Sequence, residues 1–150
     1  MKGIKLTQNK IALVDDEDYK LVSERKWFFE HGYARSDYKR KRLYMHRFIL
    51  GIEGKEVIDH KNGDGLDNRR DNLRVCTRSQ NRRNSKPNKN TSSVYKGVFK
   101  SRNKWNASIT VKYKIIRLGT FKSEIEAAVA YDKAAINFFG EFAYKNFKDS

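Results

Sequence analysis

Cysteine, proline and long apolar runs are almost absent from this chain of 150 residues. The single cysteine, Cys76, cannot form an intramolecular disulfide or build a zinc cage of several cysteines. The longest unbroken apolar run, 127–131, has five residues, whereas a membrane-spanning helix needs about 20. The charged first residues are followed by no apolar stretch typical of a secretory signal. These absences exclude disulfide-rich secreted proteins and membrane-spanning proteins, and we expect a cytoplasmic location.

Acidic residues are also scarce, with 18 Asp and Glu against 33 Lys and Arg, which leaves a formal net charge of +15. A surplus of this size indicates a nucleic acid, an anionic membrane or an acidic protein as the partner. Binding to a membrane surface needs a basic amphipathic helix, and the one clear helical pattern, after Ser123, is not basic. Aromatic residues make up 13% of the chain, which argues against disorder. The composition therefore favours a folded protein that binds nucleic acid.

The stretch 82–93 contains no apolar residue and no acidic residue, and it holds the only proline, Pro87. Such a segment cannot bury surface to offset the entropy lost on ordering, so we expect a linker. The sequence thus predicts a first domain over 1–81, a basic linker over 82–93 and a second domain over 94–150. Arg82 and Arg83, at the start of the linker, are candidate contacts to nucleic-acid phosphates.

The second domain shows two kinds of periodicity. Apolar residues at 105, 107, 109 and 111 alternate with polar ones, which is typical of a strand with one buried face. The runs 94–100 and 115–121 are predicted as its neighbouring strands. Ser123 and Glu126 then form a capping box, and helical spacing of apolar residues follows until Gly140, which can end the helix with a left-handed residue. The pattern predicts a three-stranded antiparallel sheet with one helix packed across one face.

The other face of this sheet is left open. Between 94 and 122 there are eight basic residues and no acidic residue, whereas a face that is merely solvated usually carries both signs. A small sheet with basic and short polar side chains fits the major groove of duplex DNA. The candidate DNA contacts here are Lys96, Lys100, Arg102, Lys104, Asn106, Ser108, Thr110, Lys112 and Arg117.

Many separated positions between 93 and 147 match one known family. They include Tyr95-Lys96-Gly97-Val98, Trp105-Asn106-Ala107, Leu118-Gly119-Thr120-Phe121, Ala130-Tyr131-Asp132 and Asn146-Phe147. Here the chain resembles the APETALA-two (plant ethylene-response-factor type) DNA-binding domain, which implies a sheet that reads the major groove. Lys96 lies where the family has a base-contacting Arg. The resemblance also implies a different target sequence, because further contacting residues of the plant proteins are replaced by Phe99, Thr110, Ile115 and Arg117.

The first domain opens with short strand-like runs at 11–14 and 26–29. The acidic run 15–18 between them is expected to be a solvated turn or a helix N-terminus, where carboxylates complement the helix dipole, rather than a metal site. A basic stretch follows, made of Arg35, Lys39, Arg40, Lys41, Arg42 and Arg47. Arg40 and Arg42 are candidate DNA contacts, and a solvated hairpin is the alternative.

The stretch 57–81 is the most informative part of the first domain. Its first residues predict a strand that ends in Asp59-His60, and a polar loop containing glycine follows. The run 73–76 predicts a second strand, and a capping box at 77–80 begins a helix. Two strands and a helix in this order would bring Asp59 and His60 close to Asn81.

These three side chains have the parts needed for phosphodiester hydrolysis. Carboxylate and amide oxygens suit Mg²⁺, and a neutral His beside the ion can take a proton from an attacking water. Other sites fit less well. A calcium loop needs Asp or Asn where Lys61 and Gly63 stand, the chain has too few Cys and His for a structural zinc site, and Cys76 in an apolar strand is typical of a core residue rather than a nucleophile.

The spacing Asp59-His60 … Asn72 … Asn81, flanked by Met45-His46-Arg47, resembles the HNH endonucleases of the phage and intron homing type. The resemblance covers 44–84 and implies a ββα-metal fold. It implies that Asp59 and Asn81 bind Mg²⁺, with Mn²⁺ or another divalent ion as alternatives, and that His60 is the general base. Asn72 would hold the loop so that His60 points correctly. His46 is interpreted first as a structural histidine.

Together these patterns predict an α+β protein. Its first domain has a β-rich N-terminal part followed in sequence by a ββα-metal nuclease module, and its second domain has three antiparallel strands packed on one helix. The predicted function is site-directed cleavage of double-stranded DNA by a monomer or weak dimer of phage or mobile-element origin, without a membrane partner or a small-molecule substrate. The alternative is a DNA-binding transcription regulator with an inactive nuclease-like domain. RNA binding by the predicted sheet is disfavoured, because this sheet lacks the adjacent pair of exposed aromatic residues on which RNA bases stack.

Overall fold

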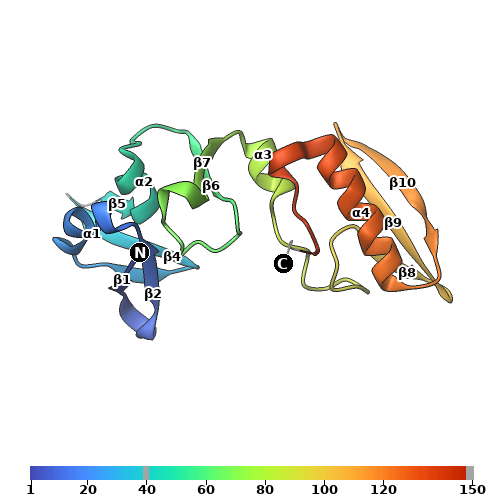
Figure 1. The fold of residues 1–150 in the computed structure, drawn as a ribbon, viewed down its shortest axis with the longest axis horizontal. Coiled ribbons are helices and arrows are strands. Elements are labelled where there is room, and N and C mark those ends of the chain that lie inside the picture. Colours follow the sequence, from blue (N-terminus) through green and yellow to red (C-terminus); the bar gives the residue numbers. More distant parts are fainter. Residues whose placement is uncertain (39–40, 148–150) are drawn as a thin grey trace. The chain divides into compact units, whose positions relative to one another are not determined.

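The computed structural model describes residues 1–38 and 41–147. The chain divides into two compact units, Met1–Asn81 and Arg82–Ser150 (Figure 1). Both units combine helices with small antiparallel sheets, so the predicted mixture of helices and antiparallel strands is confirmed. None of the helices within these described ranges is long and apolar enough to cross a membrane.

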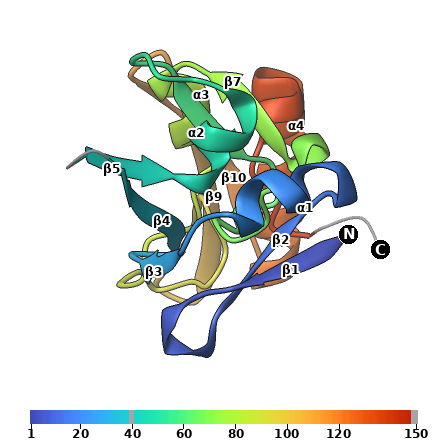
Figure 2. The ribbon, with the colours of Figure 1, turned by 90° about the vertical axis from the view of Figure 1, so that its left-hand side faces the viewer.

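The first unit begins with a hairpin and a short helix. β1 (Lys2–Lys5) and β2 (Ile11–Val14) pair in antiparallel register around the 3-10 turn η1 (Thr7–Asn9). α1 (Asp16–Ser23) follows and packs beside β1 (Figure 2). Three acidic residues occupy its first turn, where they complement the helix dipole. The acidic run is therefore a helix N-terminus, one of the two arrangements expected for it.

A second small sheet and a helix complete the frame of the first unit. β3 (Phe28–Glu30), β4 (Tyr33–Tyr38) and β5 (Lys41–Tyr44) form a three-stranded antiparallel sheet, and α2 (Met45–Leu50) follows β5 directly. Between these elements lies an apolar core whose most deeply buried members, all at most 2% exposed, are Ala12, Val14, Val22, Trp27, Ala34 and Met45. Ile58 and Leu73, from the hairpin described next, also pack into this core.

That hairpin is built from β6 (Val57–His60) and β7 (Leu73–Cys76), which pair antiparallel across a 12-residue loop ending in the 3-10 turn η2 (Arg70–Asn72). α3 (Arg78–Arg83) begins two residues after β7. The predicted capping box is confirmed, because the Gln80 N–H donates to Thr77 Oγ1 and the Thr77 N–H donates to Gln80 Oε1. The order strand, loop, strand, helix is as predicted.

The second unit is one sheet and one long helix. β8 (Val98–Ser101), β9 (Lys104–Val111) and β10 (Lys114–Phe121) pair antiparallel in the order β10-β9-β8, and α4 (Glu124–Phe139) lies across one face, as Figure 1 shows. The Ser123–Glu126 capping box starts α4 as predicted. Small residues let the helix approach the sheet closely, and Ala127, Ala128 and Ala135 are fully buried. The short 3-10 turn η3 (Gly140–Phe142) follows.

Two details of the second unit differ from the sequence prediction. The first strand was expected over 94–100 but begins only at Val98, because Gly97 adopts φ +75° in a turn pressed against the Tyr131 ring. Gly140 ends α4 with φ 54° and ψ −130°, which is a positive-φ conformation but not the left-handed helical one expected. In both places a glycine supplies a backbone conformation that periodicity alone does not reveal.

The predicted linker, 82–93, belongs to the second compact unit. The Ser93 hydroxyl donates to Glu124 Oε1 at 2.6 Å and accepts from the Tyr95 N–H. At the other end of the segment, carbonyl oxygens of Arg83 and Ser85 accept from Lys96 Nζ. Both ends of the segment are thus bonded to the second unit, and its role as a flexible tether stays a prediction.

Candidate active site and nucleic-acid interface

Asp59 and His60 lie side by side on β6, and each is only 5% exposed. The register places Asp59 opposite Arg74 on β7, whose Nε and Nη2 donate to Asp59 Oδ2 at 2.8 and 2.6 Å. Both members of this ion pair are less than a tenth exposed. A buried carboxylate needs such a partner, and the sequence prediction missed Arg74 because it treated 73–76 only as a strand.

The His60 ring is surrounded by other rings. Its centroid lies 5.2 Å from that of His46 and 5.8 Å from that of Tyr33. Burial lowers the pKa of His60, and this effect outweighs the opposing influence of Asn68 and of nearby carboxylates such as Asp59. His60 is therefore neutral near pH 7, which is the state that can accept a proton.

His46 packs directly against His60 from α2. Its ring stacks on Tyr44, with centroids 5.7 Å apart and an interplanar angle of 13°. None of the described residues forms a hydrogen bond with its Nδ1 atom, which is buried. Burial lowers the pKa of His46 to about 3, and the charges of His60 and Arg47 add to the decrease. A neutral His46 thus fixes one side of the His60 ring, in agreement with a structural histidine.

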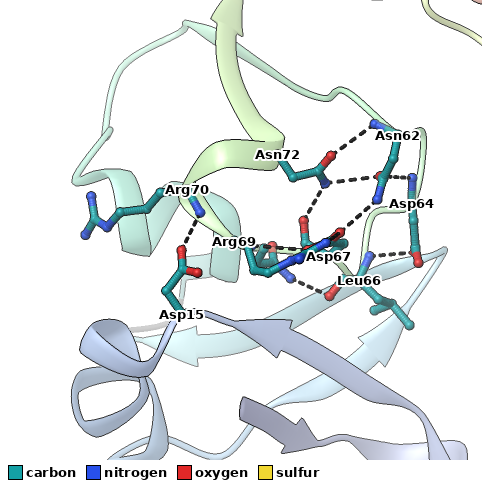
Figure 3. A network of polar contacts seen from close by, with 9 residues as sticks. Asp15, Asn62, Asp64, Leu66, Asp67, Arg69, Arg70 and Asn72 are labelled. Carbon is teal, nitrogen blue, oxygen red and sulfur yellow. Dashed lines mark hydrogen bonds and ion pairs between the residues drawn. The ribbon is translucent and has the colours of Figure 1, made fainter. Parts of the chain in front are cut away.

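Asn72 holds the loop that leaves His60 (Figure 3). Its Oδ1 accepts from the Asn62 N–H at 3.0 Å, and its Nδ2 donates to Asn62 Oδ1 at 3.1 Å and to Asp67 O at 2.7 Å. The Lys61 N–H donates to the Asn72 carbonyl at 2.9 Å. Asn72 is 8% exposed. Its amide therefore joins the two ends of the loop directly after His60.

Residues distant in sequence anchor the same loop. The backbone N–H of Arg70 donates to Asp15 at 2.8 Å (Figure 3). Its guanidinium donates to the buried Asp18 of α1 through Nε at 2.8 Å and through Nη2 at 2.7 Å. Asp67 binds Arg69 within the loop, and this bond chiefly lowers the pKa of Asp67. The acidic run 15–18 thus binds an arginine of the loop, which explains its position.

Backbone contacts attach the loop to β2. Leu13 donates to the Leu66 carbonyl and accepts from the Asn68 N–H, both at 2.8 Å. The Asn68 side chain is fully buried, and it is one of the groups that act on His60. Neither Asn68 nor the bridge to β2 was predicted, because a polar residue within a polar loop carries no periodic signal.

Asn81 lies on α3, one turn beyond Thr77, and is exposed. Burial raises the pKa of the Cys76 thiol and the Asp59 charge adds to the rise, whereas Arg74 and a hydrogen bond with the Asn81 backbone lower it. The Asn81 backbone thus lies beside Cys76 at the start of α3, and convergence of the Asn81 side chain on Asp59 stays a prediction. In residues 1–38 and 41–147, no group of three or more His, Cys, Asp or Glu could hold a metal ion.

The predicted basic contacts of the first unit are only partly placed. Arg42 is exposed on β5, 3.9 Å from Glu30. Arg40 lies outside the described residues. Arg47 donates to the carbonyl oxygens of Gly54 and Glu56, so it closes the segment after α2 rather than extending into solvent.

The register of the second sheet separates two sets of basic residues. The open face, opposite α4, carries Phe99, Ser101, Lys104, Asn106, Ser108, Thr110, Ile115, Arg117 and Thr120. Lys100 and Lys114 pair with Trp105 and Val111, and so belong to the helix side at the ends of strands. Arg102 and Lys112 occupy turns with φ of 53° and 47°. Only Lys104 and Arg117 among the predicted basic contacts thus lie on the open face, whereas Lys100 lies on the helix side and Arg102 and Lys112 lie in turns.

Lys96 is placed differently from the other candidates. Its Nζ donates to the Arg83 and Ser85 carbonyl oxygens at 2.7 and 2.6 Å and lies 5.3 Å from the centroid of the Tyr144 ring. Burial lowers its pKa to about 8. The predicted contact with DNA would require these bonds to break. Of the two arginines nearby, Arg82 is exposed and Arg83 lies over the Phe139 ring at 4.8 Å.

Two kinds of known protein are similar to this chain. The family model of HNH endonucleases matches residues 44–83. An uncharacterized HNH endonuclease of Acanthamoeba polyphaga mimivirus is 37% identical over 143 residues, which cover 90% of this chain and 74% of that protein. An AP2/ERF and B3 domain-containing transcription factor and a transcription repressor of the same description, both of Arabidopsis thaliana, are 44% identical over 76 and 75 residues. These matches cover 50% and 49% of this chain but only 22% and 21% of the plant proteins.

Proposed function

Because this chain belongs to the HNH endonuclease family, we propose that it is a metal-dependent DNA endonuclease whose β6, β7 and α3 form a ββα-metal module. The observation that carries the proposal is the placement of Asp59 and His60 on β6, beside a loop that Asn72 holds by three side-chain hydrogen bonds. Part of the chain resembles DNA-binding plant proteins, so the second unit is proposed to direct cleavage to a site on double-stranded DNA.

His60 acts as the general base in this proposal. A neutral imidazole can accept the proton of a water that attacks phosphorus. As the new P–O bond forms, the bond from phosphorus to the leaving sugar oxygen breaks. Ring packing by His46 and Tyr33 limits the orientations open to His60, which reduces the entropy lost on reaching the reactive geometry.

In this proposal, Asp59 and Asn81 are the protein ligands of a divalent ion. Asp59 supplies a carboxylate and Asn81 an amide oxygen, and Mg²⁺ is commonly bound by few protein oxygens, with waters and substrate phosphate completing its shell. Such an ion, when bound, polarises the phosphate and stabilises negative charge on the leaving oxygen. Arg74 orients the buried carboxylate of Asp59 by two charge-assisted hydrogen bonds to Oδ2. Mn²⁺ is an alternative with the same preference for oxygen ligands.

Supercoiled plasmid incubated with the full chain tests this proposal. We expect nicked circles with Mg²⁺, because each chain has one site, and no cleavage with excess chelator. His60→Ala should lower the cleavage rate by about 10²- to 10⁴-fold, since it removes only the proton acceptor, and should leave DNA binding in a gel-shift assay unchanged. His31→Asn is the matched control, because His31 is exposed and has φ 48°, a conformation that Asn tolerates. Cleavage by His60→Ala at the original rate, or cleavage with chelator, would contradict the mechanism.

A further inference from the structure

The open face of the second sheet exposes two large apolar side chains. Phe99 on β8 is 44% exposed and Ile115 on β10 is 73% exposed. Cross-strand pairing sets Phe99 next to Asn106 and Ile115 next to Thr110, so both face away from α4. Neither helps to fill the apolar core on the helix side. On a sheet face proposed to enter the major groove, these two side chains are the groups that can contact apolar atoms of base edges.

The polar groups between them are short and mostly uncharged. Ser108 and Thr110 present hydroxyls, and Asn106 Oδ1 accepts from the Thr120 hydroxyl at 2.6 Å. Arg117, paired with Ser108, is the one guanidinium in the centre of this face. Lys104 lies at the end of β9, and further lysines surround the face. The segment 94–122 carries no acid, so its charge is complementary to a phosphate backbone.

The chemistry of base edges limits what apolar atoms can recognise. In the major groove the 5-methyl group of thymine is the apolar feature of the four common bases, and guanine is read chiefly by Arg or Lys. A face with two exposed apolar side chains and a single central guanidinium therefore fits pairs that contain thymine better than a run of guanines. Resting on the proposed function of this sheet, we propose that Phe99 and Ile115 contact thymine methyl groups, and that the recognised duplex contains thymine at two separate positions near one guanine read by Arg117.

Selection from a library of randomised DNA duplexes, with the full chain and chelator to prevent cleavage, gives the preferred site. Each thymine of that site is then replaced by deoxyuridine, which removes only the methyl group. We expect two positions at which this replacement weakens binding about three- to fivefold, as the burial of one methyl group implies. A preferred site without fixed thymines, or one that tolerates every replacement by deoxyuridine, would overturn the inference.

Variants assign each methyl contact to a side chain. At one of the two positions, Ile115→Ser should bind the thymine and deoxyuridine duplexes with equal affinity, while at the other position it should still prefer thymine. Phe99→Ser should show the opposite pattern. Ile125→Ser is the matched control, because Ile125 is 58% exposed but lies on α4 rather than on the open face. It should keep both differences. The assignment would be rejected if Ile125→Ser also bound the thymine and deoxyuridine duplexes equally. It would be rejected as well if Ile115→Ser and Phe99→Ser both kept the difference in binding at both positions.

A gain of specificity separates recognition from simple loss of contact. Ile115→Arg adds a guanidinium at an exposed position, so a repeated selection should replace thymine by guanine at the position that Ile115 reads. Unchanged thymine in that selection would contradict the inference. Failure of the original chain to bind any duplex would instead refute the proposed role of the sheet in DNA binding, so the two failures are distinguishable.

Discussion

The two units place their side chains by different means. In the second unit, alanines of α4 pack against one regular sheet, and the chain order of strands is also their spatial order. In the first unit, the candidate site depends on buried polar residues, namely Asp59, His60, Asp67, Asn68 and Asn72. Apolar packing needs only the right volume and face, whereas a buried polar group needs a particular partner at hydrogen-bond distance.

This difference shows where each unit is vulnerable. The second unit tolerates polar changes on its open face but not a change in the distance between sheet and helix. The first unit is expected to tolerate little change in the loop between β6 and β7, since Asn62, Asp67 and Asn72 hydrogen-bond one another there. Because the chain has one tryptophan in each unit, Trp27 and Trp105, fluorescence of single-tryptophan variants can follow the unfolding of the two units separately.

The largest effect is expected at the contact between sheet and helix. In Gly97→Ala the new Cβ would lie 2.0 Å from the Tyr131 ring and 2.7 Å from the Ser108 carbonyl oxygen, at φ +75°. Overpacking and backbone strain together should destabilise the second unit by about 3 to 5 kcal/mol. The midpoint of denaturant unfolding followed by Trp105 fluorescence should move to lower denaturant, while the midpoint followed by Trp27 should not change.

Gly51→Ala is the control for this substitution. Gly51 also has a positive φ, of +65°, but no described atom lies within 4 Å of the Cβ that alanine would add. It should cost only the strain of about 1 to 2 kcal/mol, and in the first unit. Equal shifts of both tryptophan signals in Gly97→Ala would mean that the units do not unfold independently.

A pH titration should affect the first unit more than the second. The pKa of His46 falls from 6.5 to about 3 in the folded chain. Between these values the unfolded chain binds a proton that the folded chain does not, so stability is complete above about pH 6.5 and is lost as the pH falls towards 3. Between pH 7.5 and 4.5 the first unit should lose about 3 kcal/mol through this residue. His46→Phe should flatten the dependence seen by Trp27, whereas His31→Asn should leave it unchanged.

Removal of the Asn72 side chain should have an intermediate effect. Asn72→Ala deletes three hydrogen bonds and leaves the Asn62 N–H and the Asp67 carbonyl without this partner, at a cost of about 2 kcal/mol in the first unit. Plasmid cleavage should fall further than the fraction of folded protein does, because the loop after His60 loses its support. Asn90→Ala, at an exposed position, is the control. Normal cleavage by folded Asn72→Ala would show that the loop keeps its shape unaided.

The smallest effect distinguishes two lysines of the second unit. Lys96→Met should destabilise this unit by about 1 kcal/mol, because carbonyl acceptors lose their donor, and should leave the salt dependence of DNA binding unchanged. Lys104→Met, on the open face, should reduce the slope of log K against log salt by about 1. The reverse result would restore the contact between Lys96 and DNA that the sequence predicts.

Local patterns predicted most of the elements but few of the contacts between them. The capping boxes at Thr77 and Ser123 and the alternation along β9 are short-range signals, and the structure confirms each of them. The ion pairs Arg70–Asp18 and Arg74–Asp59 join positions 52 and 15 residues apart. Such pairs depend on register and packing, which leave no periodic trace in the sequence. The predicted roles of the site residues stay predictions until cleavage is measured.

The anchoring of Arg70 by Asp15 and Asp18 has a consequence for how the chain can be divided. The segment that matches the family model, 44–83, contains the whole loop but excludes α1 and β2, which hold it. Expressed alone, this segment would carry every proposed catalytic group and still lack the supports that arrange them. The smallest autonomous fragment must therefore reach back to the first strands, and any transplant of the segment into another scaffold must bring substitutes for both acids.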